Sequence, residues 1–440
     1  MDFLRAVQAA GVIGAGGAGF PTHVKLNTQA EFVLLNGAEC EPLLRVDQQL
    51  MAVHAAEVVR GLRICQEITG AGQAIVGIKE SHPDVIACME QAIADAGVPG
   101  MRVGTLPDVY PAGDEQVLVY ELTGRIVPET GIPIAVGCVV VNAETAFNVA
   151  RAADGQPVTD KYVTVAGDVP NPITVKVPIG TPINDLLALA GCVELDGRAV
   201  VNGGPMMGPL LTKADRYVTK KTKGLIVLPD DHSLVRRKSR TMGQAVRMNR
   251  SACEQCTMCT DLCPRHLLGH STVPHKMVRA VAYNMPADEQ TTAALTCCQC
   301  NLCEYFACPA GISPRMANVY YMFRLRDAGM KHTPKPEFHA HPLREYRQIP
   351  SARLIARLDL TRYNGPAPLT EDPLLTPTLV GIPLHDHVGA PAQPVVQVGE
   401  HVAKGQCIAQ VPEGSLGAAV HASIDGVVES VGNEIVIRRG

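Results

Sequence analysis

Tryptophan is absent from this 440-residue chain, and aromatic residues make up only 4% of it. A surface of stacked aromatic rings, of the kind that binds single-stranded nucleic acid, is therefore not expected. The formal net charge of −4 gives no basic footprint either. We expect no nucleic-acid partner.

Long apolar runs are also lacking. The longest run, around residues 131–143, is shorter than the about 20 residues needed to span a bilayer. The first residues, MDFLRAVQAAG, lack the charged-then-apolar pattern of a secretory signal. We expect a soluble, intracellular protein that does not span a membrane. Its length suggests about three domains.

Cysteine, in contrast, is abundant. A disulfide framework is not expected, because the cytosol keeps thiols reduced. Six of the fifteen cysteines are scattered, and nine lie between Cys253 and Cys308. Two motifs hold eight of these nine. The first, CEQCTMCTDLCP, contains Cys253, Cys256, Cys259 and Cys263. The second, CCQCNLCEYFACP, contains Cys297, Cys300, Cys303 and Cys308.

The spacing of the first motif is that of bacterial ferredoxins, and the second has one extra residue before its last cysteine. In two-cluster proteins the fourth cysteine of each run ligates the other cluster. We therefore predict one [4Fe–4S] cluster on Cys253, Cys256, Cys259 and Cys308, and a second on Cys297, Cys300, Cys303 and Cys263. Cys298 is a spare. The alternative is a zinc scaffold, which would leave the third and fourth cysteines of both runs unexplained.

A glycine-rich stretch near the N-terminus, GVIGAGGAGFPTHVKL, contains G-x-G-x-x-G at Gly14, Gly16 and Gly19. A dinucleotide fingerprint would follow a strand, whereas Phe3, Leu4 and Val7 predict a helix here. The stretch is therefore not a Rossmann fingerprint. Its backbone N–H groups could still approach a phosphate without obstruction by a Cβ.

Four segments carry a family resemblance: GAGGAGFPTHVKL, NGAECEP, YPAGDEQVL and VNAETAFNV. Together they resemble the flavin-binding subunit of respiratory complex I and, more closely, the C subunit of Rnf-type complexes. The resemblance implies FMN with NADH stacked on it. It implies a flavin-phosphate site at Gly16, Gly17, Gly19 and Lys25, ring or ribityl contacts from Asn36, Glu39, Asn142 and Thr145, and Glu41 and Glu115 near the nicotinamide. Ala15 stands where the complex I subunit has arginine, so we expect weaker retention of the flavin.

The fold class we predict is multidomain α/β. Residues 1–152 alternate strands with helices, which predicts a Rossmann-like flavin and NADH domain with a mainly parallel sheet. Residues 153–230 resemble a β-grasp, soluble-ligand-binding domain, although a purely structural spacer is an equal alternative. Residues 231–335 form the helical, ferredoxin-like domain for two clusters, and 377–440 resemble a barrel-sandwich hybrid. The turn PEGSLG in this last domain has no lysine, so we predict a structural role rather than a swinging arm.

Two further segments have a biased composition. Between Lys213 and Arg250 there are eleven Lys or Arg residues against three Asp, which usually indicates a solvated face. Residues 336–376 are rich in Pro, His and Arg, and we predict a linker over the surface.

This order of domains resembles the cobalamin reductases of propanediol-utilisation microcompartments. The resemblance implies an NADH-dependent flavin and iron–sulfur oxidoreductase that reduces cob(III)alamin to cob(II)alamin and then cob(I)alamin. It also implies a cobalamin adenosyltransferase and microcompartment shell or cargo proteins as partners, and a location in the cytoplasm inside a bacterial microcompartment. The alternative is an electron-transfer subunit of an Rnf-like NADH:ferredoxin or quinone complex. We expect the N-terminal helix to belong to the flavin domain.

Overall fold

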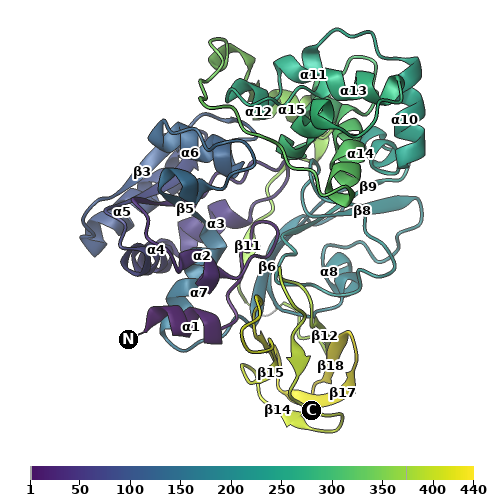
Figure 1. Cartoon of the computed structure of the whole chain (residues 1–440). Helices are drawn as coiled ribbons and strands as arrows, with labels where there is room; N and C mark the ends of the chain where they lie inside the picture. Colours follow the sequence, from purple (N-terminus) through teal and green to yellow (C-terminus); the bar gives the residue numbers. More distant parts are fainter. Residues whose placement is uncertain (1, 373) are drawn as a thin grey trace.

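The computed structural model describes residues 2–372 and 374–440. Four units follow one another along the chain (Figure 1). An α/β unit, in purple and blue, is followed by a teal sheet and a green group of short helices. A small yellow β-unit closes the chain beneath them.

The first unit is built on a four-stranded parallel sheet of order β3-β2-β1-β5. Its strands are β1 (Phe32–Asn36), β2 (Gln73–Lys79), β3 (Met101–Leu106) and β5 (Cys138–Asn142). Their continuous apolar runs are typical of parallel strands buried on both faces. Because β1 is paired with β2 on one side and β5 on the other, the strand order reverses between β1 and β5. Asn36 and Asn142 lie opposite each other at the carboxyl ends of these two strands.

Helices cover both faces of this sheet, as predicted. They are α1 (Phe3–Ala9), α2 (Thr22–Leu26), α3 (Val46–Val53), α4 (Ala55–Thr69), α5 (Pro83–Ala96), α6 (Glu115–Thr123) and α7 (Ala143–Ala153), with the 3-10 turn Pro133–Val136. Val33 and Leu35 of β1 face the core formed with α4 and α7, whereas Leu34 faces the core formed with α6. Helix α1 belongs to this unit, because Val7 is buried in the same core.

The second unit is a five-stranded mixed sheet of order β11-β7-β6-β9-β8. It contains β6 (Asp160–Gly167), β7 (Ile173–Pro178), β8 (Arg198–Asn202) and β9 (Gly224–Pro229), with helix α8 (Ile183–Leu189) packed on it. The helix begins directly after Thr181 and Pro182, and Pro182 is its N-cap residue. The arrangement is that of a small sheet covered by one helix.

The third unit consists of short helices around the cysteine motifs. They are α9 (Ser233–Lys238), α10 (Met242–Ser251), α11 (Met258–Asp261), α12 (Pro264–Leu267), α13 (Pro274–Ala282) and α14 (Pro314–Asp327), with shorter turns at Glu289–Thr296 and Leu302–Ala307. A core of aliphatic side chains from α13 and α14 also contains Cys308. The cysteine loops are therefore fixed to a packed helical frame.

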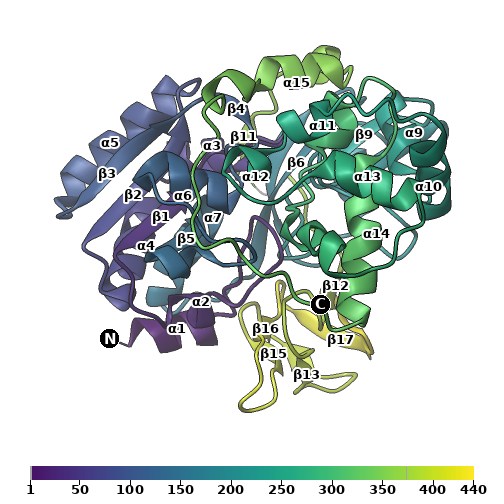
Figure 2. The same cartoon turned by 45° about the horizontal axis from the view of Figure 1, so that its top comes forward.

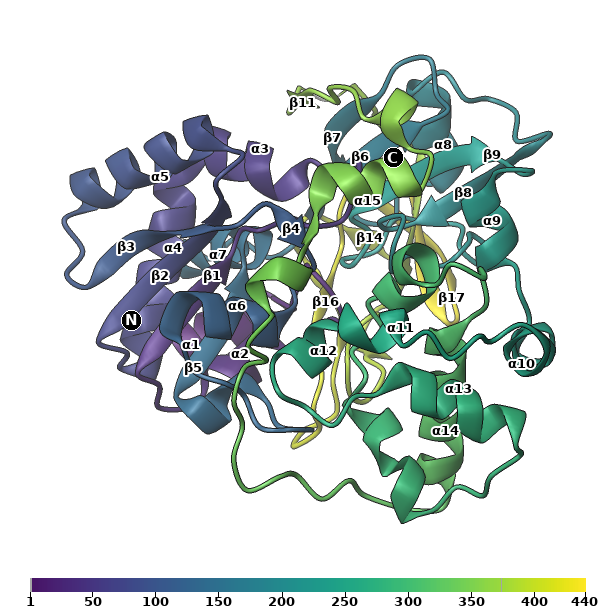
Figure 3. The same ribbon diagram turned by 90° about the horizontal axis from the view of Figure 1, so that it is seen from above.

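The segment predicted to be a surface linker, 336–376, contributes to the packing of two other units. Strand β10 (Ile349–Pro350) pairs with β4 (Val109–Tyr110) of the first unit, and β11 (Leu369–Thr370) pairs with β7. Helix α15 (Ser351–Arg357) lies across the top of the molecule (Figure 2). Viewed from above, the chain returns from α14 along the boundary between the first unit and the helices (Figure 3). The sequence prediction missed this because few apolar residues, such as the buried Leu354 and Leu360, are spread among Pro and Arg.

The last unit consists of two small sheets, β12-β18-β17-β14 and β13-β15-β16. The strands are β12 (Leu379–Pro383), β13 (Gln393–Pro394), β14 (His401–Val402), β15 (Cys407–Gln410), β16 (Val420–His421), β17 (Gly426–Val431) and β18 (Glu434–Arg438). This unit contacts the glycine-rich loop: the backbone N–H of Val388 donates to the carbonyl of Gly19 at 3.1 Å. Lys220 Nζ bridges the carbonyls of Gly11, at 2.7 Å, and Ala419, at 3.0 Å.

Candidate flavin and iron–sulfur sites

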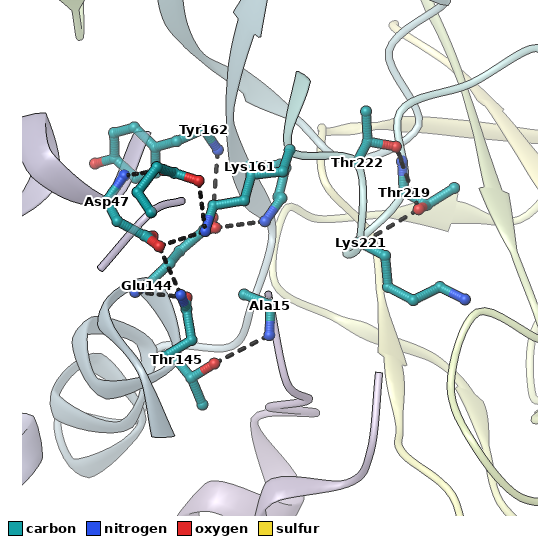
Figure 4. A network of polar contacts seen from close by, with 12 residues as sticks. Ala15, Asp47, Glu144, Thr145, Lys161, Tyr162, Thr219, Lys221 and Thr222 are labelled. Atoms are coloured by element: carbon teal, nitrogen blue, oxygen red, sulfur yellow. Dashed lines mark hydrogen bonds and ion pairs between the residues drawn. The ribbon is translucent and has the colours of Figure 1, made fainter. Parts of the chain in front are cut away.

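The glycine-rich loop connects α1 to α2. The helix before the loop is the one predicted from the sequence, whereas the short helix after it was not predicted. Gly14 N–H donates to the carbonyl of Phe20 at 2.9 Å, which closes the loop on itself. Ala15 N–H donates to Thr145 Oγ1 at 3.0 Å and attaches the loop to the start of α7 (Figure 4). Gly16 and Gly17 form the exposed tip of the loop.

A cavity of about 420 Å³ lies between this loop, the carboxyl ends of β1 and β5, and a turn of the second unit. It is lined by Ala15, Gly16, Gly17, Asn36, Glu39, Cys40, Glu41, Leu44, Asp47, Tyr110, Pro111, Gly113, Asp114, Asn142, Asn202, Gly203, Gly204, Met207, Gly208, Lys221, Lys223, Cys298 and Cys300. Open parallel sheets bind ligands at the carboxyl ends of strands where the strand order reverses. This cavity, which we call the flavin cavity, has that position and the volume of a cofactor site.

Six of the sequence-predicted flavin and nicotinamide residues line the flavin cavity, and four do not. The lining residues are Gly16, Gly17, Asn36, Glu39, Glu41 and Asn142. Lys25 forms an ion pair with Glu115 at 2.7 Å, outside the residues that line the cavity. Thr145 does not line the cavity either, but its hydroxyl accepts a hydrogen bond from the loop backbone at Ala15. Gly19 has a φ of +74°, and a Cβ there would lie 2.8 Å from the carbonyl of Asp386, so glycine is required by the contact with the last unit.

The two asparagines hold their neighbours in place. Asn36 Nδ2 donates to the carbonyl of Gly113 at 2.9 Å and fixes the loop before α6. Asn142 Oδ1 caps α7 by accepting from Glu144 N–H at 3.0 Å, while its Nδ2 donates to Asp47 Oδ2 at 2.7 Å. Each amide thus connects the end of one central strand to another wall of the cavity.

A charged group that sequence reasoning missed lies at the floor of the cavity. Lys223 pairs with Asp47 and lies 3.4 Å from Glu39 Oε1, and Asp47 N–H donates to Glu39 Oε2 at 2.8 Å. Burial, and then the charge of Asp47, raise the pKa of Glu39 to about 7. One oxygen of Asp47, Oδ1, is buried without a hydrogen-bond partner among the described residues. The cavity therefore contains the charged pair of Lys223 and Asp47, and the unpartnered Asp47 Oδ1 can accept a hydrogen bond from a polar cofactor.

Glu39→Gln should change how stability depends on pH. A carboxyl group ionises at about 4.3 in an unfolded chain, so a folded pKa near 7 makes the wild type lose stability as the pH rises between these values. We expect the variant to lose less stability over the same interval, and the two curves to run parallel above it. Urea unfolding of both proteins from pH 4.5 to 8 measures this. Parallel curves throughout would show that Glu39 stays ionised in the fold.

Glu41 connects the first unit to the second. Its carboxylate accepts from the backbone N–H groups of Met206 and Met207, each at 2.8 Å. A Cβ at Gly204 would lie 2.2 Å from Glu41 Oε2, so this close approach depends on glycine. Glu41 therefore shapes the wall of the cavity that the second unit provides.

A buried ion pair fixes the same two units deeper in the interface. Lys161 of β6 pairs with Glu144 of α7, and these side chains are 2% and 1% exposed (Figure 4). Tyr162 N–H also donates to Glu144 at 3.4 Å. Glu144 precedes Thr145, which holds the glycine-rich loop, so the pair fixes the helix end that positions the loop.

The two cysteine motifs have the same local backbone. In the first, Gln255 and Thr257 flank Cys256 with φ of 54° and 64°. In the second, Gln299 and Asn301 flank Cys300 with φ of 58° and 64°. These left-handed residues are uncommon outside glycine and turn the chain around its central cysteine. Each motif thus brings its first three cysteines to the lining of one cavity.

The fold brings the cysteines together crosswise. One cavity is lined by Cys253, Cys256, Cys259 and Cys308, and another by Cys263, Cys297, Cys298, Cys300 and Cys303. The last cysteine of each motif therefore lies with the first three of the other, in the grouping predicted from the spacing. We call the first group the outer set, because Cys256 is exposed. We call the second the inner set.

Without a metal, burial keeps cysteine thiols of both sets protonated. Burial raises the pKa of Cys259 and of Cys263 to about 12. Iron binds the thiolate form, so ligation at these positions must release the thiol protons, and the iron supplies the positive charge that replaces them. The spare Cys298 lines both the inner cavity and the flavin cavity, as does Cys300. The inner set is therefore the one next to the flavin cavity.

Arg265 supports this junction. Its guanidinium forms an ion pair with Asp114 at 2.8 Å, and both side chains are largely buried. Asp114 also caps α6 by accepting from Gln116 and Val117 N–H. A cysteine loop, the flavin cavity and a helix of the first unit are thus held together by one ion pair.

Part of the basic stretch between Lys213 and Arg250 lies inside the protein rather than on a solvated face. Lys220 is buried between the first and last units, and Lys223 is largely buried beside Asp47. Lys220 donates hydrogen bonds to backbone carbonyls of the first and last units, and Lys223 forms an ion pair with a carboxylate of the first unit. The prediction of a solvated face is wrong for these two residues.

Four family models match the chain. They are described as the Nuo51 FMN-binding domain, over residues 7–151, and the SLBB domain, over 162–210. The other two are the 4Fe-4S dicluster domain, over 252–313, and the RnfC barrel sandwich hybrid domain, over 370–439. These matches confirm the predicted fold class and the predicted FMN and [4Fe–4S] cofactors, and the dicluster match argues against the zinc scaffold.

Among curated proteins, the chain is 46% identical over 439 residues to Cobalamin reductase PduS of Salmonella typhimurium, covering 99% of this chain and 96% of that protein. The PduS of Citrobacter freundii is also 46% identical, over 437 residues. The C subunit of the Na(+)-translocating ferredoxin:NAD(+) oxidoreductase complex of Acetobacterium woodii is 34% identical over 269 residues, covering 60% of this chain and 58% of that protein.

Among solved structures, the chain is similar to an NAD+-reducing [NiFe]-hydrogenase in its air-oxidised state. The TM-score is 0.46 at 23% identity, covering 82% of this chain and 66% of that one.

Proposed function

Because this chain belongs to the family of the PduS cobalamin reductases, we propose that it is an NADH-dependent cobalamin reductase. It would reduce cob(III)alamin to cob(II)alamin and onward to cob(I)alamin, so that adenosylcobalamin is recycled during 1,2-propanediol degradation. The observation that carries the proposal is the match over 99% of the chain. The shared wall between the flavin cavity and the inner set of cysteines supports it.

The overall reaction balances without any group of the protein being consumed. NADH gives up a hydride and becomes NAD⁺, which supplies two electrons and a proton, and two single electrons take cobalt from Co(III) to Co(I). Bound FMN would accept the hydride and release electrons singly, and the two [4Fe–4S] clusters would carry them. The protein supplies position and charge.

The residues of the flavin cavity divide this work. Gly16 and Gly17 leave backbone N–H groups at the tip of the loop for a phosphate. Asn36 and Asn142 hold the walls, and Lys223 contributes a buried positive charge at the floor. We propose that Lys25, paired with Glu115, supports the loop from outside the cavity rather than from within it. Gly19 and Thr145 would act by fixing the shape of the loop.

The eight cluster ligands we propose are the crosswise sets predicted from the spacing. Electrons would pass from the flavin cavity to the inner set and then to the outer set, because the inner set shares Cys298 and Cys300 with the flavin cavity and the outer set includes the exposed Cys256. In this arrangement the acceptor meets the outer cluster.

We further propose that the protein acts with a cobalamin adenosyltransferase and with microcompartment shell or cargo proteins. This association follows from the resemblance of the domain order to the cobalamin reductases of propanediol-utilisation microcompartments. In the part of the chain that the structure describes, no helix has the length and apolar character to cross a bilayer. Helix α1 is packed into the first unit, so it is not our candidate for a shell contact.

An anaerobic assay with NADH, purified protein and cob(III)alamin tests the function. The corrinoid spectrum is followed with and without the adenosyltransferase and ATP, which consume cob(I)alamin as it forms. We expect cob(II)alamin without the partner and adenosylcobalamin with it. Rapid dye reduction without corrinoid reduction in either condition would instead favour the Rnf-like electron-transfer protein, which the similarity to the Acetobacterium woodii protein also suggests.

Gly17→Leu should release the flavin. A Cβ at Gly17 meets no atom within 4 Å, so a leucine there would fold normally and point into the space at the tip of the loop. We expect flavin content to fall at least about tenfold, from the loss of more than about 1.4 kcal/mol of binding, while iron content is unchanged. Gly72→Leu, at an exposed glycine with equal space but far from the cavity, is the matched control. Full flavin retention in Gly17→Leu would place the phosphate elsewhere.

A further inference from the structure

A second large cavity lies beside the outer set of cysteines. Its volume is about 520 Å³, and it is lined by Asp230, Arg236, Ser239, Arg240, Gln244, Arg247 and Met248. Three guanidinium groups and one carboxylate therefore face the same hollow. We call it the arginine cavity.

Two contacts fix part of the arginine cavity. Helix α10 begins with a capping box in which Thr241 and Gln244 satisfy each other's backbone N–H groups. Arg240 Nη1 donates to the carbonyl of Gly311 at 2.7 Å and so joins the cavity to the loop that follows Cys308. Arg236 and Arg247, in contrast, are exposed. One arginine is thus structural, and two are free to meet a ligand.

The cavity also adjoins the outer set through packing. Met248, which lines the cavity, packs against the same apolar core as Cys253 and Cys308. Helix α10 ends at Ser251, two residues before Cys253. Helix α10 and the hydrogen bond from Arg240 to Gly311 thus connect the arginine cavity to the chain on both sides of the outer set, from which the proposed function passes electrons to the acceptor.

We propose that the arginine cavity binds the phosphodiester of the electron acceptor, the nucleotide tail of a corrinoid. The inference rests on the proposed function. An arginine guanidinium can donate two parallel hydrogen bonds to two oxygens of one phosphate group. The volume of the cavity fits the nucleotide tail of a corrinoid but not the whole molecule. NADH also carries phosphates, but its site is the flavin cavity, whereas this one adjoins the outer cluster. The alternative is an acidic protein docked on the same exposed arginines, and the last outcome of the test below distinguishes it.

The test uses the double variant Arg236→Gln/Arg247→Gln in the holoprotein, leaving Arg240 in place. Hydroxocobalamin carries the phosphodiester tail, and cobinamide lacks it. We expect the Kd for hydroxocobalamin, by equilibrium dialysis, and the KM for its NADH-dependent reduction to rise about tenfold or more. Values for cobinamide should change little. The charge-keeping Arg236→Lys/Arg247→Lys variant should fall in between, because lysine lacks the bidentate fork.

Three controls separate this proposal from the function itself. Arg353→Gln removes an exposed arginine on α15 and should leave all values unchanged. The KM for NADH with a dye acceptor should be the same in every variant, which distinguishes the corrinoid phosphate from that of NADH. Dialysis needs no turnover, so a wild type that binds hydroxocobalamin but does not reduce it would overturn the function and leave the binding site standing.

Two results would overturn the arginine cavity as the tail site. One is an unchanged Kd for hydroxocobalamin in Arg236→Gln/Arg247→Gln. The other is a wild type that binds cobinamide as tightly as hydroxocobalamin. If the double variant changed only the rate of transfer to the adenosyltransferase, the cavity would be a protein-docking site instead.

Discussion

Lys161→Met should destabilise the protein by about 3–5 kcal/mol, because it leaves the carboxylate of Glu144 buried without its partner. The pair joins β6 to α7, so the loss should appear where the first two units meet. Urea unfolding followed by circular dichroism measures the change. Flavin fluorescence in the same titration shows whether the glycine-rich loop is released early, since Thr145 follows Glu144 directly.

The matched control is the double variant Glu144→Gln/Lys161→Met. Removing both charges leaves no isolated buried ion, so we expect it to be more stable than Lys161→Met alone. Its amide can still accept the N–H of Tyr162. A single variant within about 0.5 kcal/mol of the wild type would mean that water reaches Glu144 and that the interface opens.

Cys263→Ala should remove the inner cluster, and Cys308→Ala the outer one, although each residue belongs to the other motif in sequence. Iron content should fall from about eight to about four atoms per chain in each variant. Corrinoid reduction should be abolished in both, because electrons pass both clusters. Dye reduction by NADH should persist, because the flavin cavity is intact.

EPR of the reduced proteins identifies which cluster is lost. The spectrum of Cys263→Ala should match that of Cys300→Ala, and the spectrum of Cys308→Ala that of Cys256→Ala. Cys298→Ala is the control, since Cys298 belongs to the inner set by position but falls outside the ligand spacing. If Cys298→Ala lost as much iron as Cys300→Ala, the inner set would have to be reassigned.

The cysteine sets could be predicted because their geometry is local. Each motif places its first three thiols within seven residues, and the same left-handed residues flank both central cysteines. Only the crosswise pairing is long-range, and the known behaviour of two-cluster ferredoxins supplies it. The helix before the glycine-rich loop was likewise visible in the spacing of Phe3, Leu4 and Val7.

The charged floor of the flavin cavity could not be predicted in this way. Lys223 and Asp47 are 176 residues apart, and only the docking of the second unit on the first brings them together. In sequence, Lys223 is one cation in a basic stretch. The family resemblance predicted Lys25 at the flavin phosphate, but Lys25 does not line the cavity. A family motif gives only the position of a residue in the chain. The ion pair of Lys25 with Glu115 depends on where α6 lies in the fold.

The contact between the last unit and the glycine-rich loop has a consequence for biosynthesis. Gly19 accepts a hydrogen bond from Val388 and leaves room for Asp386, and Lys220 joins Gly11 to Ala419. Asp386 and Val388 leave the ribosome about 370 residues after the loop, which at 5–20 residues per second is a delay of about 20–70 s. The loop therefore takes its final shape only after the last unit has been synthesised. Flavin uptake should be a late event in maturation, and a stalled nascent chain lacking residues after 376 should bind the cofactor more weakly than the released protein.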